Sequence, residues 1–440
     1  MKFQTLGISL KIGVAFSLLT AACAAPVPTA VPAPTAEAPV TLNVWGGYPE
    51  MDAVYQKAAD AFKLKHPNVT VTIFSTDLRG FEQKLVTSLP SKTAGDVVIR
   101  TNNFLSRFID EGLFSTVPDD LKALIKGGAY ESAAVKESTL KDQVVGVPLF
   151  KGSTALFYNT DMLAEAGLAG PPKTMDQIIE YARKLAKLDA NGDVVRSGLS
   201  LRISGQGSGV AEKFWILLYQ YGHNLLKESS PGKWKADFNG PAGVKLFQMY
   251  VDFLQEKVDS PNIDHDAKAF ETKQTAMFAR ESWVVADIAK NAPDLVGHYG
   301  SVALPVGELG SFETMYVPAA SPNQLIAWDF IRFLTEAEQQ FSIAELAGWI
   351  PARNDLDLKD FIKKNPGFEG FLGRPENFTV TLTPQISEFD EIETKLAAHL
   401  VEAYADYANL SGSPDKIQAL LNTWADETNA ILKTNGHYDG

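Results

Sequence analysis

The sequence predicts an α/β protein, on two kinds of observation. The chain has 440 residues, of which 45% are hydrophobic and 21% charged, an ordinary composition for a folded protein of roughly two or three domains. From residue 41 onward, β-type runs alternate with helical patterns, which indicates right-handed βαβ units on a mainly parallel sheet. Beyond the N-terminus no apolar run reaches about 18 residues, so a protein with several membrane-spanning helices is excluded.

The N-terminus has a positive start, an apolar stretch and then small residues. Lys2 and Lys11 are the only charges before residue 37, and the small residues lead directly to Cys23. This pattern predicts a signal peptide over 1–22, too short for an ordinary spanning helix. The cysteine resembles that of a bacterial lipobox, which predicts cleavage before Cys23 and its lipidation. Thr20 replaces the usual leucine, so a plain secretory signal with an incidental cysteine is the alternative.

Residues 23–40 are predicted to form a linker that begins with the lipidated cysteine. The 17 residues after Cys23 contain five prolines, six alanines and one charge, without periodicity. A proline-rich chain extends by about 3 Å per residue, so this stretch would span roughly 50 Å. We therefore expect a stalk between a membrane anchor and a folded body that starts near Thr41.

The first elements of the body follow from apolar periodicity and helix-ending residues. A glycine pair ends the first β-rich run, and His66-Pro67 ends the helix after it. The expected elements are a strand at 41–45, a helix at 49–66, a strand at 69–74, a helix near 81–89 and a strand at 96–99.

Later helices carry capping signals at their starts. Each signal is a Ser or Thr followed by a residue suited to the first helical turn. These predicted starts are Thr174 with Gln177, Ser321-Pro322 with Gln324, Thr335 with Glu338, and Ser413-Pro414. Trp215, Trp328 and Trp424 lie at helical core spacing and are expected to be structural.

Composition also limits the chemistry. With 40 Lys+Arg against 53 Asp+Glu, the formal charge is −13, which disfavours nucleic acid as a partner. Cys23 is the only cysteine, which excludes a Cys-rich zinc site and an iron–sulfur cluster. Glycines at 205, 207 and 209 lack the lysine of a phosphate loop; they form a flexible helix start, or their amides face a ligand oxygen. No metal and no cofactor are therefore expected.

Several short motifs, in a fixed order, carry a family resemblance. They are Trp45 after the first strand; 95–98 followed by 110–114; Gly146-Val147-Pro148 followed by 156–163, 166–168 and 171–174; 273–277 leading to Trp283; and 303–305 followed by 327–334 and 348–353. In this order and spacing, the body over 41–435 resembles the extracellular solute-binding proteins of ABC importers, the family that includes the maltodextrin-binding proteins.

The resemblance implies a two-lobed, periplasmic-binding-protein-like α/β clamshell of type II, with a ligand cleft between its lobes. The chain would cross the hinge three times, near 146–152, 303–308 and 350–354. Lobe one would then comprise 41–147 plus 308–352, and lobe two 148–307 plus 353–440.

The resemblance also places the ligand at the carboxyl ends of strands, where loops from both lobes converge. Aromatic planes would cover the C–H faces of a sugar, and polar side chains would bind its hydroxyls. The expected ligand-binding residues are Trp45, Gly47, Tyr48, Arg100, Asn102, Asn103, Lys151, Ser153, Gln206, Arg280, Trp283, Tyr316 and Trp349. The aromatic residues have a core role as their alternative, and Arg100 and Arg280 have an interlobe ion pair.

The expected function is capture without catalysis. The protein would bind a mono- or oligosaccharide between its lobes and deliver it to the transmembrane permease of an ABC transporter. Ligand selects the closed form because it contacts both lobes. We expect a monomer outside the cytoplasm, anchored to the membrane only by lipid. The alternatives are a secreted carbohydrate-active enzyme, which would need paired carboxylates in its cleft, and a binder of another solute such as a polyamine.

Overall fold

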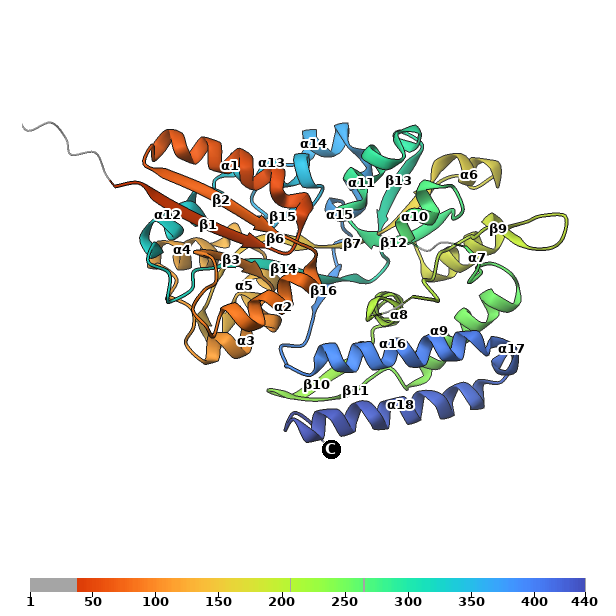
Figure 1. Cartoon of the computed structure of the whole chain (residues 1–440). Coiled ribbons are helices and arrows are strands. Elements are labelled where there is room, and N and C mark those ends of the chain that lie inside the picture. The colour runs from red at the N-terminus through yellow and green to blue at the C-terminus, as the bar shows by residue number, and fades with distance from the viewer. Residues whose placement is uncertain (1–37, 206, 264–265, 440) are drawn as a thin grey trace, which may run out of the picture. The chain divides into compact units, whose positions relative to one another are not determined.

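Strands and helices alternate through the first part of the body in the computed structural model, which describes residues 38–205, 207–263 and 266–439 (Figure 1). The first elements are β1 (Val40–Gly46), α1 (Asp52–Lys65), β2 (Val69–Ser75), α2 (Leu78–Ser88) and β3 (Val97–Arg100). β1 pairs in parallel with both β2 and β3. The predicted succession of elements is confirmed, with boundaries displaced by at most three residues.

The first sheet also takes in strands from much later in the chain. Its order is β15-β6-β14-β3-β1-β2, and β16 pairs with β14. The added strands are β6 (Val147–Gly152), β14 (Gly307–Tyr316), β15 (Ile350–Pro351) and β16 (Thr379–Leu382). β14 runs antiparallel to both β3 and β6. The expectation of a mainly parallel sheet is therefore wrong for this part, because β14 enters the sheet from the opposite direction.

Short helices and one hairpin accompany this sheet. They are α3 (Asn102–Asp110), α4 (Asp119–Leu124), α5 (Ser132–Glu137), α12 (Gln324–Leu334) and α13 (Ala337–Ser342), with β4 (Thr139–Leu140) and β5 (Gln143–Val144) as the hairpin. α1 and α12 present apolar faces to one hydrophobic cluster, to which Phe62 and Phe330 contribute.

A second, antiparallel sheet has the order β12-β7-β13. Its strands are β7 (Thr154–Asn159), β12 (Met277–Glu281) and β13 (Tyr299–Ala303). The helices in this part are α6 (Thr160–Glu165), α7 (Met175–Leu185), α8 (Gly209–Tyr219), α9 (Pro241–Gln255), α10 (Asp266–Glu271), α11 (Val284–Asn291), α14 (Lys359–Lys364), α15 (Glu369–Leu372), α16 (Phe389–Ala405), α17 (Tyr407–Leu410) and α18 (Pro414–Thr434). This part also contains two antiparallel hairpins. One pairs β8 (Lys187–Leu188) with β9 (Val194–Arg196), and the other pairs β10 (Leu226–Ser230) with β11 (Lys233–Ala236).

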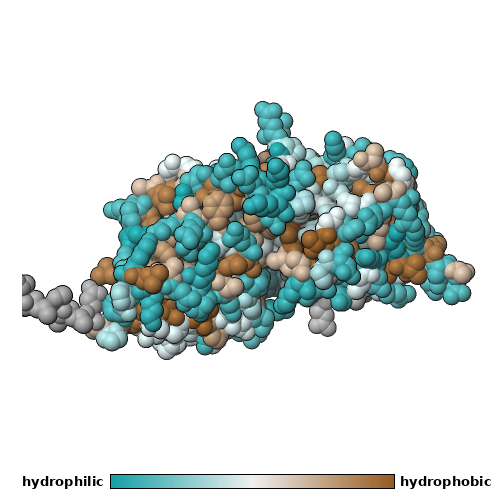
Figure 2. Space-filling model, turned by 90° about the horizontal axis from the view of Figure 1, so that it is seen from above, coloured by the Kyte–Doolittle hydropathy of each residue, from teal (hydrophilic) through white to brown (hydrophobic). Residues whose placement is uncertain are grey.

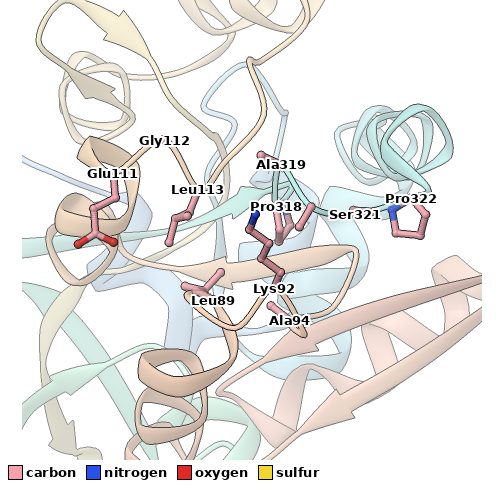
Figure 3. A pocket seen from close by; sticks show the side chains of 11 residues that line it. Leu89, Lys92, Ala94, Glu111, Gly112, Leu113, Pro318, Ala319, Ser321 and Pro322 are labelled. Carbon is pink, nitrogen blue, oxygen red and sulfur yellow. The ribbon is translucent and has the colours of Figure 1, made fainter.

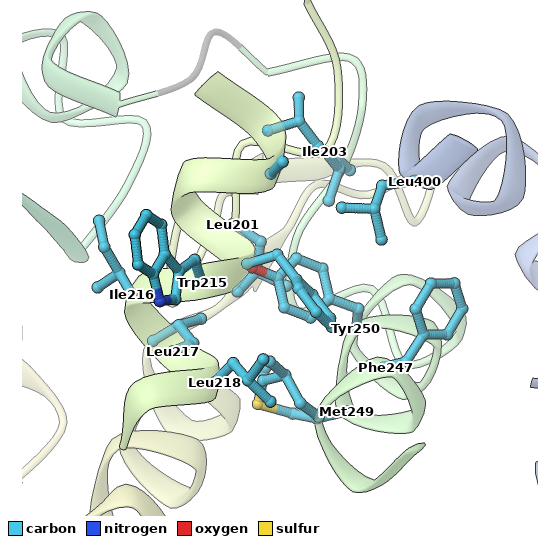
Figure 4. Packing of buried hydrophobic residues seen from close by; sticks show 14 of the residues in the cluster. Leu201, Ile203, Trp215, Ile216, Leu217, Leu218, Phe247, Met249, Tyr250 and Leu400 are labelled. Carbon is cyan, nitrogen blue, oxygen red and sulfur yellow. The ribbon is translucent and has the colours of Figure 1, made fainter. Parts of the chain in front are cut away.

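The largest hydrophobic cluster lies where α8, α9, α16 and α18 pack together (Figures 1 and 4). Trp215 and Trp424 are buried in it, and Trp328 is buried in the cluster beneath the first sheet. The prediction that these three tryptophans are structural is confirmed. A separate core under each sheet is what two lobes require.

Three passages of the chain between the two sheets lie near the expected hinge crossings, and the chain returns once more to the first sheet at β16, which lies inside the segment 353–440 expected in lobe two. β6 leads into β7 through Ser153, β13 leads into β14 through 304–306, and β15 is followed by residues that continue into α14. These passages lie at or directly beside the segments in which the resemblance places the hinge crossings. The precise limits of the lobes stay a prediction.

Capping signals were only partly informative about where helices start. The Thr174 hydroxyl accepts a bond from the Gln177 amide at 3.1 Å, as predicted for the start of α7. The prediction for Thr335 is wrong, because its hydroxyl donates back to the carbonyl of Arg332 at the end of α12. Hydroxyl side chains form such backward bonds readily, and α13 begins only after Glu336.

The surface seen in Figure 2 is predominantly hydrophilic, with apolar residues in separate patches. Leu64 and Leu325 are the most exposed large apolar side chains of the described residues. Among the helices of the described part, we find none with the length and apolarity needed to cross a membrane.

Candidate functional site

Two predicted ligand residues, one just after β1 and one at the last position of β3, meet at a buried glutamate, Glu313 of β14. The Tyr48 hydroxyl donates to Glu313 Oε1 at 2.7 Å, and Arg100 Nη1 donates to the same oxygen at 2.9 Å. Arg100 Nε also donates to Glu82 of α2 at 3.1 Å. The guanidinium is thus held between two carboxylates of the same lobe. The alternative of an interlobe ion pair is therefore wrong for Arg100.

Burial sets the electrostatics of this group. Burial raises the pKa of Glu313, and the nearby Arg100 guanidinium and Tyr48 hydroxyl act against that rise. Burial also raises the pKa of Tyr48 well above its usual value, so the phenol is a hydrogen-bond donor at neutral pH. The protonated Tyr48 hydroxyl therefore donates its hydrogen to the Glu313 carboxylate.

Trp349 lies beside Tyr48. The two rings meet edge-on with centroids 5.5 Å apart, and Phe150 lies 5.5 Å from Tyr48 on another side. The Trp349 indole donates to Glu50 at 3.2 Å, and the residue is only 6% exposed. We call Tyr48, Arg100, Glu313 and Trp349 the lobe-one wall.

The other predicted residues of lobe one lie deeper or serve packing. Trp45 is half-buried against Phe74, with the Lys84 ammonium 4.6 Å from its ring. A side chain at Gly47 would lie 2.8 Å from the Phe81 ring, so close packing against Phe81 favours glycine here.

Asn102, Asn103 and Tyr316 were also expected at the ligand. Asn102 is fully buried at the start of α3 and accepts a bond from the buried Tyr316 hydroxyl at 3.5 Å. Tyr316 packs against Phe114, inside lobe one. Asn103 is half-buried in the next position of α3. The structure therefore places Asn102 and Tyr316 in the core.

Lys151 and Ser153 belong to a charged network at the chain crossings. Lys151 donates to Glu131 at 2.8 Å, and Ser153 donates to Glu308 at the start of β14. Arg374, which precedes β16, bonds Glu308, donates to Ser153 at 3.0 Å and lies 3.6 Å from Glu131. We call these five residues the crossing network. Because it joins segments on both sides of two crossings, it fixes their mutual geometry.

Arg280 and Trp283 lie together at the end of β12. Arg280 Nε is 3.3 Å from Glu281, and its guanidinium lies 5.5 Å from the Trp283 ring. The indole donates to Glu281 at 3.3 Å. Glu212 of α8 lies 3.8 Å from Arg280, and burial together with the Glu281 charge raises its pKa to about 7. These contacts make an aromatic and acidic surface, which we call the lobe-two wall.

Trp283 also contacts the other lobe. It is half-buried and packs against the hydrophobic clusters beneath both sheets. Gly348, which precedes Trp349, lies so close that an added side chain would be 2.9 Å from Ala286. Arg79 of α2 likewise reaches Gly207, next to the start of α8. These contacts join segments that flank the lobe-one wall to segments that flank the lobe-two wall.

Two predicted residues lie outside the described part of the chain, namely Gln206 and Cys23.

Sequence reasoning missed Glu313, Glu82 and Glu308. The available signal was the pair of glutamates, Glu308 and Glu313, inside the mostly buried strand β14, but their partners come from distant segments.

A separate cavity of about 360 Å³ lies near the start of β3 and the end of β14. It is lined by Leu89, Leu113 and the segment 318–322 (Figure 3). Lys92 and Glu111 are among its polar lining residues. It shares no residue with either wall.

Within 38–205, 207–263 and 266–439, there is no cluster of His, Cys, Asp and Glu suited to a metal ion.

A family comparison matches most of the body. The family described as bacterial extracellular solute-binding protein matches residues 57–370. A lactose-binding protein of Rhizobium radiobacter is 25% identical over 329 residues, which cover 68% of this chain and 71% of that protein.

Solved structures show a similar fold. The GacH receptor of Streptomyces glaucescens, solved unliganded and with acarbose, gives a TM-score of 0.74 at 21% identity, covering 92% of this chain and 100% of that one. A solute-binding protein of an ABC transporter from Thermotoga lettingae, bound to α-D-tagatose, gives 0.73 at 21% identity, covering 89% and 99%. These similarities confirm the predicted two-lobed α/β fold.

Proposed function

Because the chain belongs to the family of bacterial extracellular solute-binding proteins, we propose that it is the substrate-binding lipoprotein of an ABC transporter. In this proposal it captures a mono- or oligosaccharide between its two lobes and delivers it to the membrane permease. The solute leaves unchanged, since the protein's role is capture and release. The protein acts as a monomer outside the cytoplasm.

The pairing of the two walls is the observation that carries this proposal. Tyr48 on one wall and Trp283 on the other are half-buried and offer aromatic surface to the C–H faces of a sugar ring, while the buried Trp349 backs Tyr48 from the core. Carboxylates and a guanidinium stand beside them on each wall, where they would bind hydroxyls. Relatives with similar sequence or fold are named for lactose or were solved with acarbose or tagatose.

Anchoring is a separate part of the proposal. Cleavage before Cys23 and lipidation of that cysteine would tether the protein through the proline-rich linker. Radiolabelled palmitate should label the wild-type chain in a bacterial host and leave the Cys23→Ser chain unlabelled. Equal labelling of both would contradict lipidation at this position.

Thermal unfolding of the full chain against a panel of saccharides tests the ligand class. A ligand at about a thousand times its dissociation constant adds on the order of 4 kcal/mol, which gives a clear rise in the midpoint. We expect one class of saccharide to produce this rise and to be recovered intact. A rise with spermidine or an amino acid alone would overturn the sugar, and cleavage of the sugar would indicate an enzyme.

A further inference from the structure

Glu313 is a carboxylate placed inside a central strand. β14 pairs with β3 on one side and with β6 on the other, and Glu313 is only 2% exposed. Burying a carboxylate is costly unless donors compensate it. Both strong donors, the Tyr48 hydroxyl and Arg100 Nη1, bond to the same oxygen, Oε1.

These bonds fix two residues of the lobe-one wall. Arg100 is held on one side by Glu313 and on the other by Glu82, so its guanidinium has one orientation. Tyr48 is held by its hydroxyl at one end while its ring packs against Phe150 and Trp349. A carboxylate that accepts from both side chains sets their relative position.

The charge of this group does not balance. Glu82 and Glu313 share the single Arg100 guanidinium, and Glu50 adds another carboxylate beside Trp349. The Lys84 ammonium on the same helix as Glu82 faces the rings of Trp45 and Phe74. Glu313 Oε2 is also buried and has no hydrogen-bond partner in the described chain. An unpaired buried oxygen leaves the charge of Glu313 less compensated, and the surplus negative charge favours a solute that donates hydrogen bonds.

We propose that Glu313 is a positioning residue that makes the lobe-one wall select neutral or cationic solutes over anionic ones. This inference rests on the proposed function, because it assumes that solute binds against this wall. It goes further by assigning a basis for selection to a residue that touches Tyr48 and Arg100.

The structure offers a matched control at the start of β3, the strand that pairs with β14. Asp96 precedes β3, is 4% exposed and accepts bonds from the Asn43 amide at 2.8 Å and from Ser321 at 2.6 Å. Asp96→Asn and Glu313→Gln both remove one buried charge at constant size. Only Glu313→Gln changes the surroundings of Tyr48 and Arg100.

The test is calorimetric titration of the wild-type chain and both variants. The panel pairs neutral lactose, maltotriose and tagatose with anionic lactobionate, glucuronate and glycerol 3-phosphate, and includes cationic spermidine and choline. We expect the wild type to prefer neutral or cationic members. Glu313→Gln should weaken the binding of neutral and cationic solutes about tenfold, and should lower the ratio of their affinity to that of the anionic solutes. Asp96→Asn should leave that affinity ratio within about twofold of the wild-type value.

The outcomes separate the two proposals. A wild type that prefers an anionic member, or a Glu313→Gln variant with wild-type selectivity, would overturn the role of Glu313. Binding of a cation but no saccharide would overturn the sugar and leave the charge selection supported. A wild type that binds no member would overturn both.

Discussion

Single residues show how charge is balanced in the two walls and in the crossing network. Arg100, Lys151 and Arg280 were all predicted as ligand residues, and each lies within 3.3 Å of a carboxylate. A cation paired with a carboxylate attracts an anionic ligand less than an unpaired cation does. Its orientation, however, is fixed before the ligand arrives. The walls are therefore organised for hydroxyl donors and acceptors, which agrees with a neutral sugar.

Trp283 should be an energetic centre of ligand binding. Trp283→Ala removes the aromatic surface of the lobe-two wall and should weaken saccharide binding by about tenfold or more, roughly 1.4 kcal/mol. Trp234→Ala is the matched control, because Trp234 is also half-buried but lies in β11. Fluorescence titration measures both. Equal losses of affinity would mean that Trp283 acts only through stability.

Glu137 should make stability depend on pH. Burial is the main cause that raises its pKa to about 8, and hydrogen bonding to Gln385 opposes it. The native state therefore holds this proton more tightly than the unfolded chain, whose glutamate titrates near 4.5. This group favours the native state at low pH, and its cost grows by up to ~1.4 kcal/mol per pH unit as pH rises from about 4.5 to 8.

Glu137→Gln should remove that contribution. Urea unfolding at several pH values between about 5 and 8 should show a smaller fall in stability for the variant than for the wild type. Identical pH profiles would show that Glu137 has no raised pKa in the folded protein.

The positions of the wall residues were more predictable than their partners. Tyr48 lies just after β1 and Arg100 is the last residue of β3, positions that a short-range pattern approximates, and the structure brings them together at one carboxylate. Glu313 is 265 residues from Tyr48 in sequence, and only the pairing of β14 with β3 brings them near. For the same reason, local spacing did not reveal that Tyr316 is in the core.

At the scale of the elements, helix caps provide a direct comparison. Thr174 caps α7 by accepting from the Gln177 amide, whereas Ser413 at the start of α18 makes no such bond with its side chain. Thr174→Ala should therefore cost about 1 kcal/mol, and Ser413→Ala only a few tenths. Denaturant unfolding of the two variants measures this, and similar losses would contradict the role of the Thr174 hydroxyl.

The strands and helices of the first units were predictable because their signals are local. Apolar periodicity, glycine and proline identified β1 to β3 and the helices between them. The direction of β14 was not, because antiparallel pairing with β3 and β6 depends on how the chain returns from the other sheet. Thr335 failed as a cap because a hydroxyl has two competing backbone partners, one in each flanking helix.

At the scale of the whole molecule, ordered motifs were more informative than composition. Each motif is short, but the order of the motifs along the chain, from Trp45 to 348–353, predicted the family and the two-lobed fold. Both predictions are confirmed. The crossing network could not be predicted, since Arg374 and Glu131 are remote from Ser153 and Glu308. It ties the crossings together while each lobe keeps its own core.

Small-angle X-ray scattering of the full chain, titrated with the saccharide that stabilises it most, tests the central claim most directly. If a sugar is captured between two lobes, the radius of gyration should fall at saturation, with one sugar bound per chain and the sugar recovered intact. A sugar that raises the unfolding midpoint while the radius of gyration stays constant from zero to saturation would contradict capture by closure.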